Sequence, residues 1–236
     1  MRIAVGLLAL VLALFASAPV LAEQVGTALA ERSIDQQRKP VVVPRAAPKP
    51  VLGGYGLFDY EWMTAKDTFD AVFNTQKFRG VGAGAEVLNL WQGLFARVSF
   101  SRTSVTGSRA DVVNGVPLSL GIPLRLKLMT VEFAGGWRIP VDRRRRYTAY
   151  GGAGVLLVTY RETSDFAGPG EDSRDTFKGY TAFGGIDAGI WKWIYAGAEA
   201  QYRRVPDALG DGGVSKEFGD TDLGGATIRI LFGVRK

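Results

Sequence analysis

Charged side chains recur along the chain at positions that alternate with small or apolar residues. The charged set comprises Glu86, Arg97, Glu132, Arg138, Asp187, Glu199, Arg203 and Arg229. Such groups have three chemical uses: stable ion pairs, a gate in which an arginine exchanges carboxylate partners, or general acid–base catalysis by two carboxylates. Asp187 and Glu199 are the pair that could serve as acid and base.

The residue types that are missing restrict this choice. The 236 residues include no histidine and no cysteine. Histidine is the commonest general base and transition-metal ligand, and cysteine would be needed for thiolate chemistry or disulfides. We therefore favour ion pairing and expect no catalytic residue, no metal site and no cofactor. The basic residues behind the net charge of +6 are dispersed along the chain, so nucleic acid is not an expected partner.

A hairpin between Phe183 and Arg203 indicates how such side chains would be positioned. Ile186 alternates with Asp187 in its first strand, and Ala198 alternates with Glu199 in its second. Because successive side chains of a β-strand point to opposite faces, one face of the hairpin is apolar and the other is polar and glycine-rich. An apolar outer face and a polar inner face are typical of a transmembrane β-barrel wall.

The same alternation predicts eight strands in all, including the two of this hairpin. The other six are Gly53–Met63, Phe78–Leu88, Leu94–Thr103, Arg125–Ile139, Tyr147–Arg161 and Gly225–Arg235. The connections alternate between short turns and long polar segments. The short ones are Asn89–Gly93, Pro140–Arg146 and Trp191–Lys192, and the long ones are Thr64–Lys77, Ser104–Pro123, Glu162–Gly179 and Pro206–Asp222. The sequence therefore predicts an all-β fold, an eight-stranded antiparallel up-and-down transmembrane β-barrel with short periplasmic turns and long extracellular loops.

One predicted strand, Arg125–Ile139, has an irregular pattern. Its apolar residues on one parity oppose Glu132 on the other, but Leu124, Leu126 and Leu128 have the parity of Glu132. If all the apolar side chains face the same way, a β-bulge must shift the alternation. We therefore expect a bulge near Met129.

Large aromatic side chains gather near the ends of the predicted strands. They are Tyr60, Trp62, Trp91, Trp137, Trp191, Trp193 and Tyr202. Amphipathic rings prefer the headgroup layer of a membrane, so we interpret these residues as interfacial aromatic girdles.

The first 51 residues differ in composition from the rest of the chain. A short positive start is followed by the apolar run Ile3–Phe15 and by small residues, which is typical of a secretory signal peptide cleaved after Ala22. Residues 23–51 contain regularly spaced prolines and predict a flexible, proline-rich periplasmic segment. Residues 52–236 then form the outer-membrane β-barrel domain.

Two short motifs add a family resemblance. The glycine-rich stretch Tyr150–Val155 and the terminal pattern of Ile228, Ile230 and Phe232, together with the signal peptide and proline-rich segment, resemble the small OmpA/OmpX/OmpW-type outer-membrane barrels. The resemblance implies a Gram-negative outer membrane, with its lipids, lipopolysaccharide and the barrel-assembly machinery as partners. In that family the last strand commonly ends on an aromatic residue, whereas Gly-Val-Arg-Lys follows Phe232 here. The barrel enzymes on this scaffold rely on a histidine, so their activities do not carry over.

Three functions are compatible with these features. The favoured one is an integral outer-membrane barrel of structural or surface-interaction type, without enzymatic turnover, whose lumen is filled by an ion-pair network. The alternative is a narrow channel for ions or small apolar solutes, in which Arg97 or Arg229 switches between carboxylates. A second alternative is a soluble periplasmic lipocalin-like barrel that binds a ligand inside, which would require apolar residues to face inward.

Overall fold

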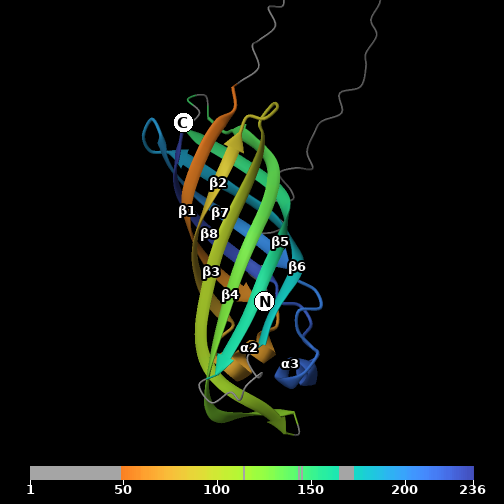
Figure 1. The fold of residues 1–236 in the computed structure, drawn as a ribbon. Coiled ribbons are helices and arrows are strands. Elements are labelled where there is room, and N and C mark those ends of the chain that lie inside the picture. The colour runs from red at the N-terminus through yellow and green to blue at the C-terminus, as the bar shows by residue number, and fades with distance from the viewer. Residues whose placement is uncertain (1–48, 114, 143, 145, 165–172) are drawn as a thin grey trace, which may run out of the picture. The chain divides into compact units, whose positions relative to one another are not determined.

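The computed structural model describes residues 49–113, 115–142, 144, 146–164 and 173–236. The predicted signal peptide and nearly all of the proline-rich segment lie outside these residues. These described residues form eight strands and two short helices (Figure 1). The strands are β1 (Val51–Met63), β2 (Lys77–Leu88), β3 (Leu94–Val113), β4 (Val116–Pro140), β5 (Tyr147–Ser164), β6 (Ser173–Gly189), β7 (Ile194–Arg204) and β8 (Gly225–Arg235). The helices are α2 (Lys66–Phe73) and α3 (Gly213–Phe218).

Each strand pairs with its sequence neighbours, and β1 pairs with β8 to close the barrel. All the pairings are antiparallel, and at the closing seam Asp59 lies opposite Arg229. Closure pairs the edges that an open sheet would leave exposed. The predicted all-β, eight-stranded antiparallel barrel is confirmed. Among the described residues, neither helix is long and apolar enough to cross a membrane.

Residue alternation separates the two sides of the wall. On β8, for example, Thr227 and Arg229 are buried inside, whereas Ile228 and Ile230 are exposed on the outside. Because the side-chain period of a strand is two, one strand can supply a charged interior and an apolar exterior at the same time.

The two rims of the barrel differ in construction. At one rim the strands are joined by short turns, and both ends of the barrel segment lie there, where Leu52 and Lys236 exchange backbone hydrogen bonds of 3.1 and 2.8 Å. Gly93 closes the turn between β2 and β3 with φ +88°, a left-handed conformation that favours glycine. The opposite rim carries α2, α3 and the longer connections (Figure 1).

The segment Ser104–Pro123, expected as a long loop, is instead part of a β-hairpin. Pairing of β3 with β4 continues from Leu94 opposite Trp137 to Val113 opposite Val116, with a register shift between Ser108 and Ala110. The hairpin extends past the rim (Figure 1). The predicted loop Glu162–Gly179 is likewise shortened by the ends of β5 and β6. Beyond the rim a hairpin needs no apolar face, so the alternation that marked the other strands is missing there.

The expected bulge near Met129 is wrong. Pairing of β4 with β5 is regular from Leu124 opposite Ser164 to Pro140 opposite Thr148. Leu126 therefore faces inward on the same side as Glu132, and its exposed fraction is 0%. The inner face itself changes from charged to apolar along β4.

This apolar end of the interior is covered by α2. Phe69 and Phe73, on one face of the helix, pack against Phe78, with ring centroids of Phe69 and Phe78 5.1 Å apart. Together with Met63, Leu124, Leu126, Leu128, Leu156, Val158, Val205 and Leu223 they form a layer that we call the leucine cap. The Thr68 hydroxyl donates a hydrogen bond of 2.7 Å to Asp220, which links α2 to the connection between β7 and β8.

Candidate functional site

The candidate site is the charged interior of the barrel, and its centre is Arg97 on β3. The Arg97 guanidinium lies 2.8 Å from a Glu132 oxygen on β4 and 2.5 Å from a Glu199 oxygen on β7. All three side chains are buried, so each charge depends on its partners rather than on water. One arginine thus joins a carboxylate on the neighbouring strand to a carboxylate on β7, four strands away around the barrel.

Arg229 on β8 extends this arrangement across the closing seam. Its Nε and Nη2 atoms donate to the two Asp59 oxygens at 2.7 and 3.0 Å, a bidentate contact. Its Nη1 atom lies 3.3 Å from Glu132. Glu132 therefore binds both Arg97 and Arg229, which connects the two arginines through one carboxylate.

Arg203 on β7 completes the group. Its Nη2 atom lies 3.1 Å from Asp59, it also pairs with Glu61, and its Nε donates to Gln201 at 2.8 Å. Gln201 in turn donates to Glu199. We call this group the central charged cluster. Its members are Asp59, Glu61, Arg97, Glu132, Glu199, Gln201, Arg203 and Arg229.

A second group of charges lies nearer the rim with the short turns. Arg235 on β8 donates to Glu86 at 2.8 Å and to Asp187 at 2.9 Å, and Arg138 also pairs with Asp187. The Tyr195 hydroxyl donates to Glu86 at 2.9 Å. Glu86, Arg138, Asp187 and Arg235 form the turn-side charged cluster.

An aromatic layer of Tyr55, Phe95, Tyr150, Phe183 and Tyr195 packs with Leu57 and Leu231 along the strands between the two charged clusters. The Arg97 guanidinium lies 3.9 Å from the Phe183 ring centroid, so the layer also makes a cation–π contact with the central cluster. Wall glycines provide the space for these rings. A Cβ atom on Gly84 would lie 2.4 Å from the Tyr55 ring, and one on Gly185 would lie 2.7 Å from the Tyr150 ring.

The charged residues singled out from the sequence thus fall into two groups. Arg97, Glu132, Glu199, Arg203 and Arg229 meet in the central charged cluster. Glu86, Arg138 and Asp187 meet in the turn-side charged cluster. Asp187 and Glu199, the pair considered for acid–base chemistry, are bound by different arginines. Among the described residues no group of carboxylates is arranged to hold a metal ion.

Sequence reasoning missed three charged members, Asp59, Glu61 and Arg235. Asp59 and Glu61 alternate with Tyr60 and Trp62, so the period-two pattern was available to place them inside. Arg235 was harder to identify because it is the last residue of β8, and the period-two alternation cannot be followed beyond it.

The predicted aromatic girdle residues lie on the outer surface at two levels. Trp91, Trp137, Trp191 and Trp193 lie near the short turns and are 57–77% exposed. Tyr60, Trp62 and Tyr202 lie toward the other rim, and the rings of Tyr60 and Trp62 are in edge contact with centroids 4.6 Å apart.

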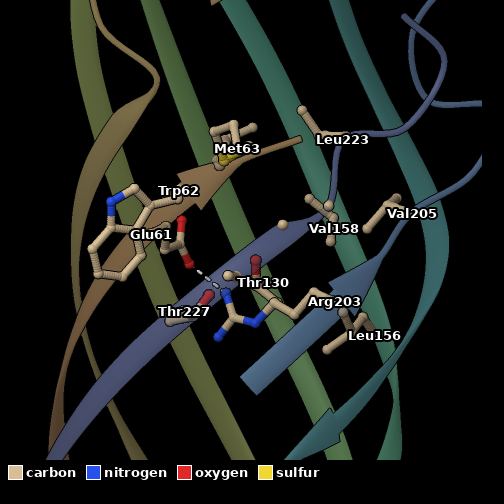
Figure 2. A pocket seen from close by; sticks show the side chains of 14 residues that line it. Glu61, Trp62, Met63, Thr130, Leu156, Val158, Arg203, Val205, Leu223 and Thr227 are labelled. Carbon is tan, nitrogen blue, oxygen red and sulfur yellow. Dashed lines mark hydrogen bonds and ion pairs between the residues drawn. The ribbon is translucent and has the colours of Figure 1, made fainter. Parts of the chain in front are cut away.

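The interior between the central charged cluster and the leucine cap leaves little free space. A cavity of about 30 Å³ lies there, with Glu61 and Arg203 on one side and Met63, Val158 and Val205 on the other (Figure 2). This volume has room for about a single water molecule. Outside the leucine cap, a larger cleft of about 490 Å³ lies between α2, the segment around α3 and the ends of the long hairpins.

At the long-connection rim, Asp222 links the end of β7 to the start of β8 through hydrogen bonds. Its carboxylate accepts hydrogen bonds of 2.8 Å from the backbone N–H groups of Val205 and Gly224 and one of 2.7 Å from Arg204 Nε. Partial burial acts to raise the pKa of Asp222, but the hydrogen bonds from Arg204 and the two N–H groups outweigh it and lower the pKa below its ordinary value.

No protein-family model matches the chain, and no curated protein matches its sequence. Three solved barrels illustrate the structural likeness that exists. The attachment invasion locus protein Ail of Yersinia pestis, in complex with a heparin analogue, aligns with a TM-score of 0.48 and 11% identity over 80% of this chain and 100% of that one. Neisserial surface protein A aligns with a TM-score of 0.44 and 13% identity over 79% of this chain and 95% of that one. The N-terminal β-barrel domain of Pseudomonas aeruginosa OprF aligns with a TM-score of 0.41 and 10% identity over 79% of this chain and 97% of that one. All three TM-scores lie below 0.5 and the sequence identities are low, so these likenesses carry no function across.

Proposed function

We propose that this chain is an integral outer-membrane β-barrel of structural and surface-interaction type, closed to bulk flow and without enzymatic turnover. The observation that carries this proposal is the apolar outer surface of the wall. Large apolar side chains are 39–62% exposed there, which would be unfavourable in water. They include Phe58, Val81, Val98, Phe100, Met129, Phe133, Val155, Ile186, Ile228, Ile230 and Phe232.

The height of this surface suits a membrane. On β8 the outward residues from Ala226 to Val234 are all apolar, and β4 is apolar outside from Met129 to Trp137. Nine strand residues at a tilt of about 40–45° rise roughly 20–25 Å, close to the apolar band of an outer-membrane barrel. Aromatic residues border the surface at both levels, as expected for a protein that meets two headgroup layers.

The filled lumen supports a structural role over the channel alternative. Passage along the axis would have to cross the turn-side charged cluster, the aromatic layer, the central charged cluster and the leucine cap. Arg97 and Arg229 each contact two carboxylates at the same time and share Glu132, so moving either one would remove an ion-pair partner from two buried acids. Such a loss is costly in a barrel interior. The lipocalin-like alternative has less support, because it requires apolar residues to face inward, whereas Asp59, Glu132 and Arg229 are buried inside the barrel.

Surface interaction is assigned to the rim with the long connections. There α2, α3 and the extended β3–β4 hairpin surround the cleft of about 490 Å³, and Val113, Val116, Leu118 and Leu120 are about half exposed on the hairpin. These features give that rim a contoured, partly apolar surface. In an outer membrane it would face the outside of the cell.

The first test is fractionation of cells that express the full chain, with gels of boiled and unboiled samples. A band in the outer-membrane fraction that shifts on heating supports a closed membrane barrel. Recovery in the soluble periplasm without a shift would overturn the proposal and favour the lipocalin-like alternative.

The second test separates a closed barrel from a channel. Purified protein in planar bilayers should show no sustained single-channel current. Conductance that appears in the unaltered protein and changes in Arg97→Ala or Arg229→Ala would establish the channel instead. Tyr202→Phe, on the outer surface, is the control that should leave any current unaltered.

A further inference from the structure

The outer wall carries a series of cations just beyond its apolar surface. On each strand from β2 to β6 the first charged outward residue past the apolar stretch is basic. These residues, which we call the basic collar, are Arg79, Arg102, Lys127, Arg161 and Lys178. They lie toward the rim with the long connections. Within the part of the chain that the structure describes, none of the five has a carboxylate within ion-pair distance.

Five acids of the wall, by contrast, point away from this surface. Asp59, Glu86, Glu132, Asp187 and Glu199 are all buried inside the barrel. A wall with these five acids on its inner face and the basic collar on its outer face is charged asymmetrically. Its outer surface therefore has positive charge toward the rim with the long connections.

On β4, β5 and β6 the strand register places basic residues of the outer face next to one another. Lys127 on β4 lies directly opposite Arg161 on β5, and Arg161 lies directly opposite Arg174 on β6. Like charges directly opposite one another destabilise a sheet. Neighbouring strands are about 4.8 Å apart, so the three Cα atoms span roughly 10 Å. We call these three residues the basic row.

The repulsion within the basic row is offset if an anion lies across it. The row is located where the apolar surface ends: Leu157 and Met129 precede it on β5 and β4 and are 40% and 42% exposed. A ligand that covers both regions must have an apolar part beside an anionic headgroup. Guanidinium and ammonium groups bind phosphate oxygens strongly, and guanidinium groups do so through paired hydrogen bonds.

We propose that the basic row is a binding site for the phosphate groups of lipids in the membrane leaflet at the long-connection rim, with their acyl chains on the adjacent apolar wall. This proposal rests on the membrane location proposed above and adds the chemical class of the lipid and the residues that bind it. The flanking members of the basic collar, Arg102 and Lys178, extend the site to neighbouring lipids.

The test uses the full chain in nonionic detergent and native mass spectrometry. The probes are diphosphoryl lipid A, the same lipid with both phosphates removed, and inorganic phosphate. The unaltered protein should bind the phosphorylated lipid preferentially, and inorganic phosphate should compete only weakly. In K127Q/R161Q/R174Q the affinity for the phosphorylated lipid should fall by on the order of 100-fold, since each basic residue near an anionic surface contributes a factor of about five.

A control variant with the same change in net charge removes three basic residues elsewhere, in K66Q/K192Q/K216Q. Lys66 and Lys216 lie on the helices, and Lys192 lies in a short turn at the opposite rim. This variant should retain the affinity of the unaltered protein. Equal affinity for the two lipids, an equal loss in the control variant, or full competition by inorganic phosphate would each overturn the lipid-phosphate site.

The free energy of unfolding provides a second test, because the triple variant should be the more stable protein without lipid and the less stable one with it. Without lipid, removal of the three facing cations should leave the barrel slightly more stable, because the cross-strand repulsion is gone. With the phosphorylated lipid, the unaltered protein should gain stability and the triple variant should not. A triple variant that is less stable in both conditions would instead indicate a purely structural role. The heat shift on gels tests the membrane barrel independently of the lipid site. A barrel that is folded and inserted but does not prefer the phosphorylated lipid contradicts only the lipid site.

Discussion

Asp59 and Arg229 form a bidentate ion pair across the closing seam of the barrel, with both side chains completely shielded from solvent. The seam joins the first strand to the last, so this contact is available only once the chain is complete. The pair therefore couples closure of the barrel to neutralisation of its interior.

Removing one partner of this pair should be strongly destabilising. Asp59→Ala removes the bidentate partner of the buried Arg229 and leaves it with Glu132 at 3.3 Å and Glu199 at 4.0 Å, and we expect a loss of about 3–5 kcal/mol in the free energy of unfolding. Urea titration in lipid vesicles measures it. Asp59→Leu combined with Arg229→Leu should recover much of the loss, because no charge is left unpaired. A double variant as unstable as Asp59→Ala would contradict this explanation.

The leucine cap provides a second test of the interior. Leu126→Ala empties part of a fully buried position and should cost about 2–5 kcal/mol. Leu118→Ala, on the exposed hairpin, is the matched control and should change the free energy of unfolding by less than about 0.5 kcal/mol. Equal effects at the two positions would show that Leu126 does not face the interior.

The cap also indicates where sequence reasoning succeeds and where it stops. Period-two alternation located the strands and placed Glu132 and Arg229 inside, because every wall residue must face either the lumen or the exterior. It failed at Leu126, because the assumption that apolar residues face outward ignores what covers the lumen. That cover is α2, a helix of 8 residues, and its only signal is the four-residue spacing of Phe69 and Phe73.

Partner choice was beyond the sequence for a different reason. Arg97 could have paired with any inward acid at a similar height along the axis, and the barrel brings Glu199 to it from a strand 102 residues away. Such contacts depend on the stagger of all the strands together. The extension of β3 and β4 beyond the rim was missed because pairing there is independent of membrane-type alternation.

Two buried tyrosines should respond in opposite ways to loss of the hydroxyl group. The Tyr55 hydroxyl has no hydrogen-bond partner among the described residues, so Tyr55→Phe should leave stability unchanged or raise it by about 1 kcal/mol. The Tyr195 hydroxyl donates to Glu86, so Tyr195→Phe should cost about 1.5–3 kcal/mol. Thermal unfolding of both variants in the same detergent provides the comparison. A cost at Tyr55 as large as that at Tyr195 would indicate a bound partner for its hydroxyl.

Asp222 should make the long-connection rim sensitive to acid. Its pKa is lowered in the folded chain, so its stabilising effect is complete above its unfolded pKa of about 3.8 and is lost as the pH falls through the lower folded value. Asp222→Asn should be less stable than the unaltered chain by about 1 kcal/mol at neutral pH. This difference should disappear in strong acid, where the native carboxyl is also neutral.

Hydrogen exchange at the amides of Val205 and Gly224 reports directly on this contact. The two amides donate to Asp222, so their protection should decrease in the variant at neutral pH. Amides in the centre of β8 serve as an internal control and should be unaffected. A difference between variant and native chain that persists unchanged in strong acid would exclude the charge of Asp222 as its cause.

The segregation of acids to the inside and unpaired bases to the outside has a consequence for assembly. A strand that paired one position out of register would turn its acids toward hydrocarbon and its apolar residues toward the charged lumen. On β4 this slip would expose Glu132 and leave Arg97 without one of its partners. A misaligned hairpin is therefore destabilised on both faces of the wall, by acids in the hydrocarbon and by apolar residues in the charged lumen. The charge pattern thus favours closure in the correct register.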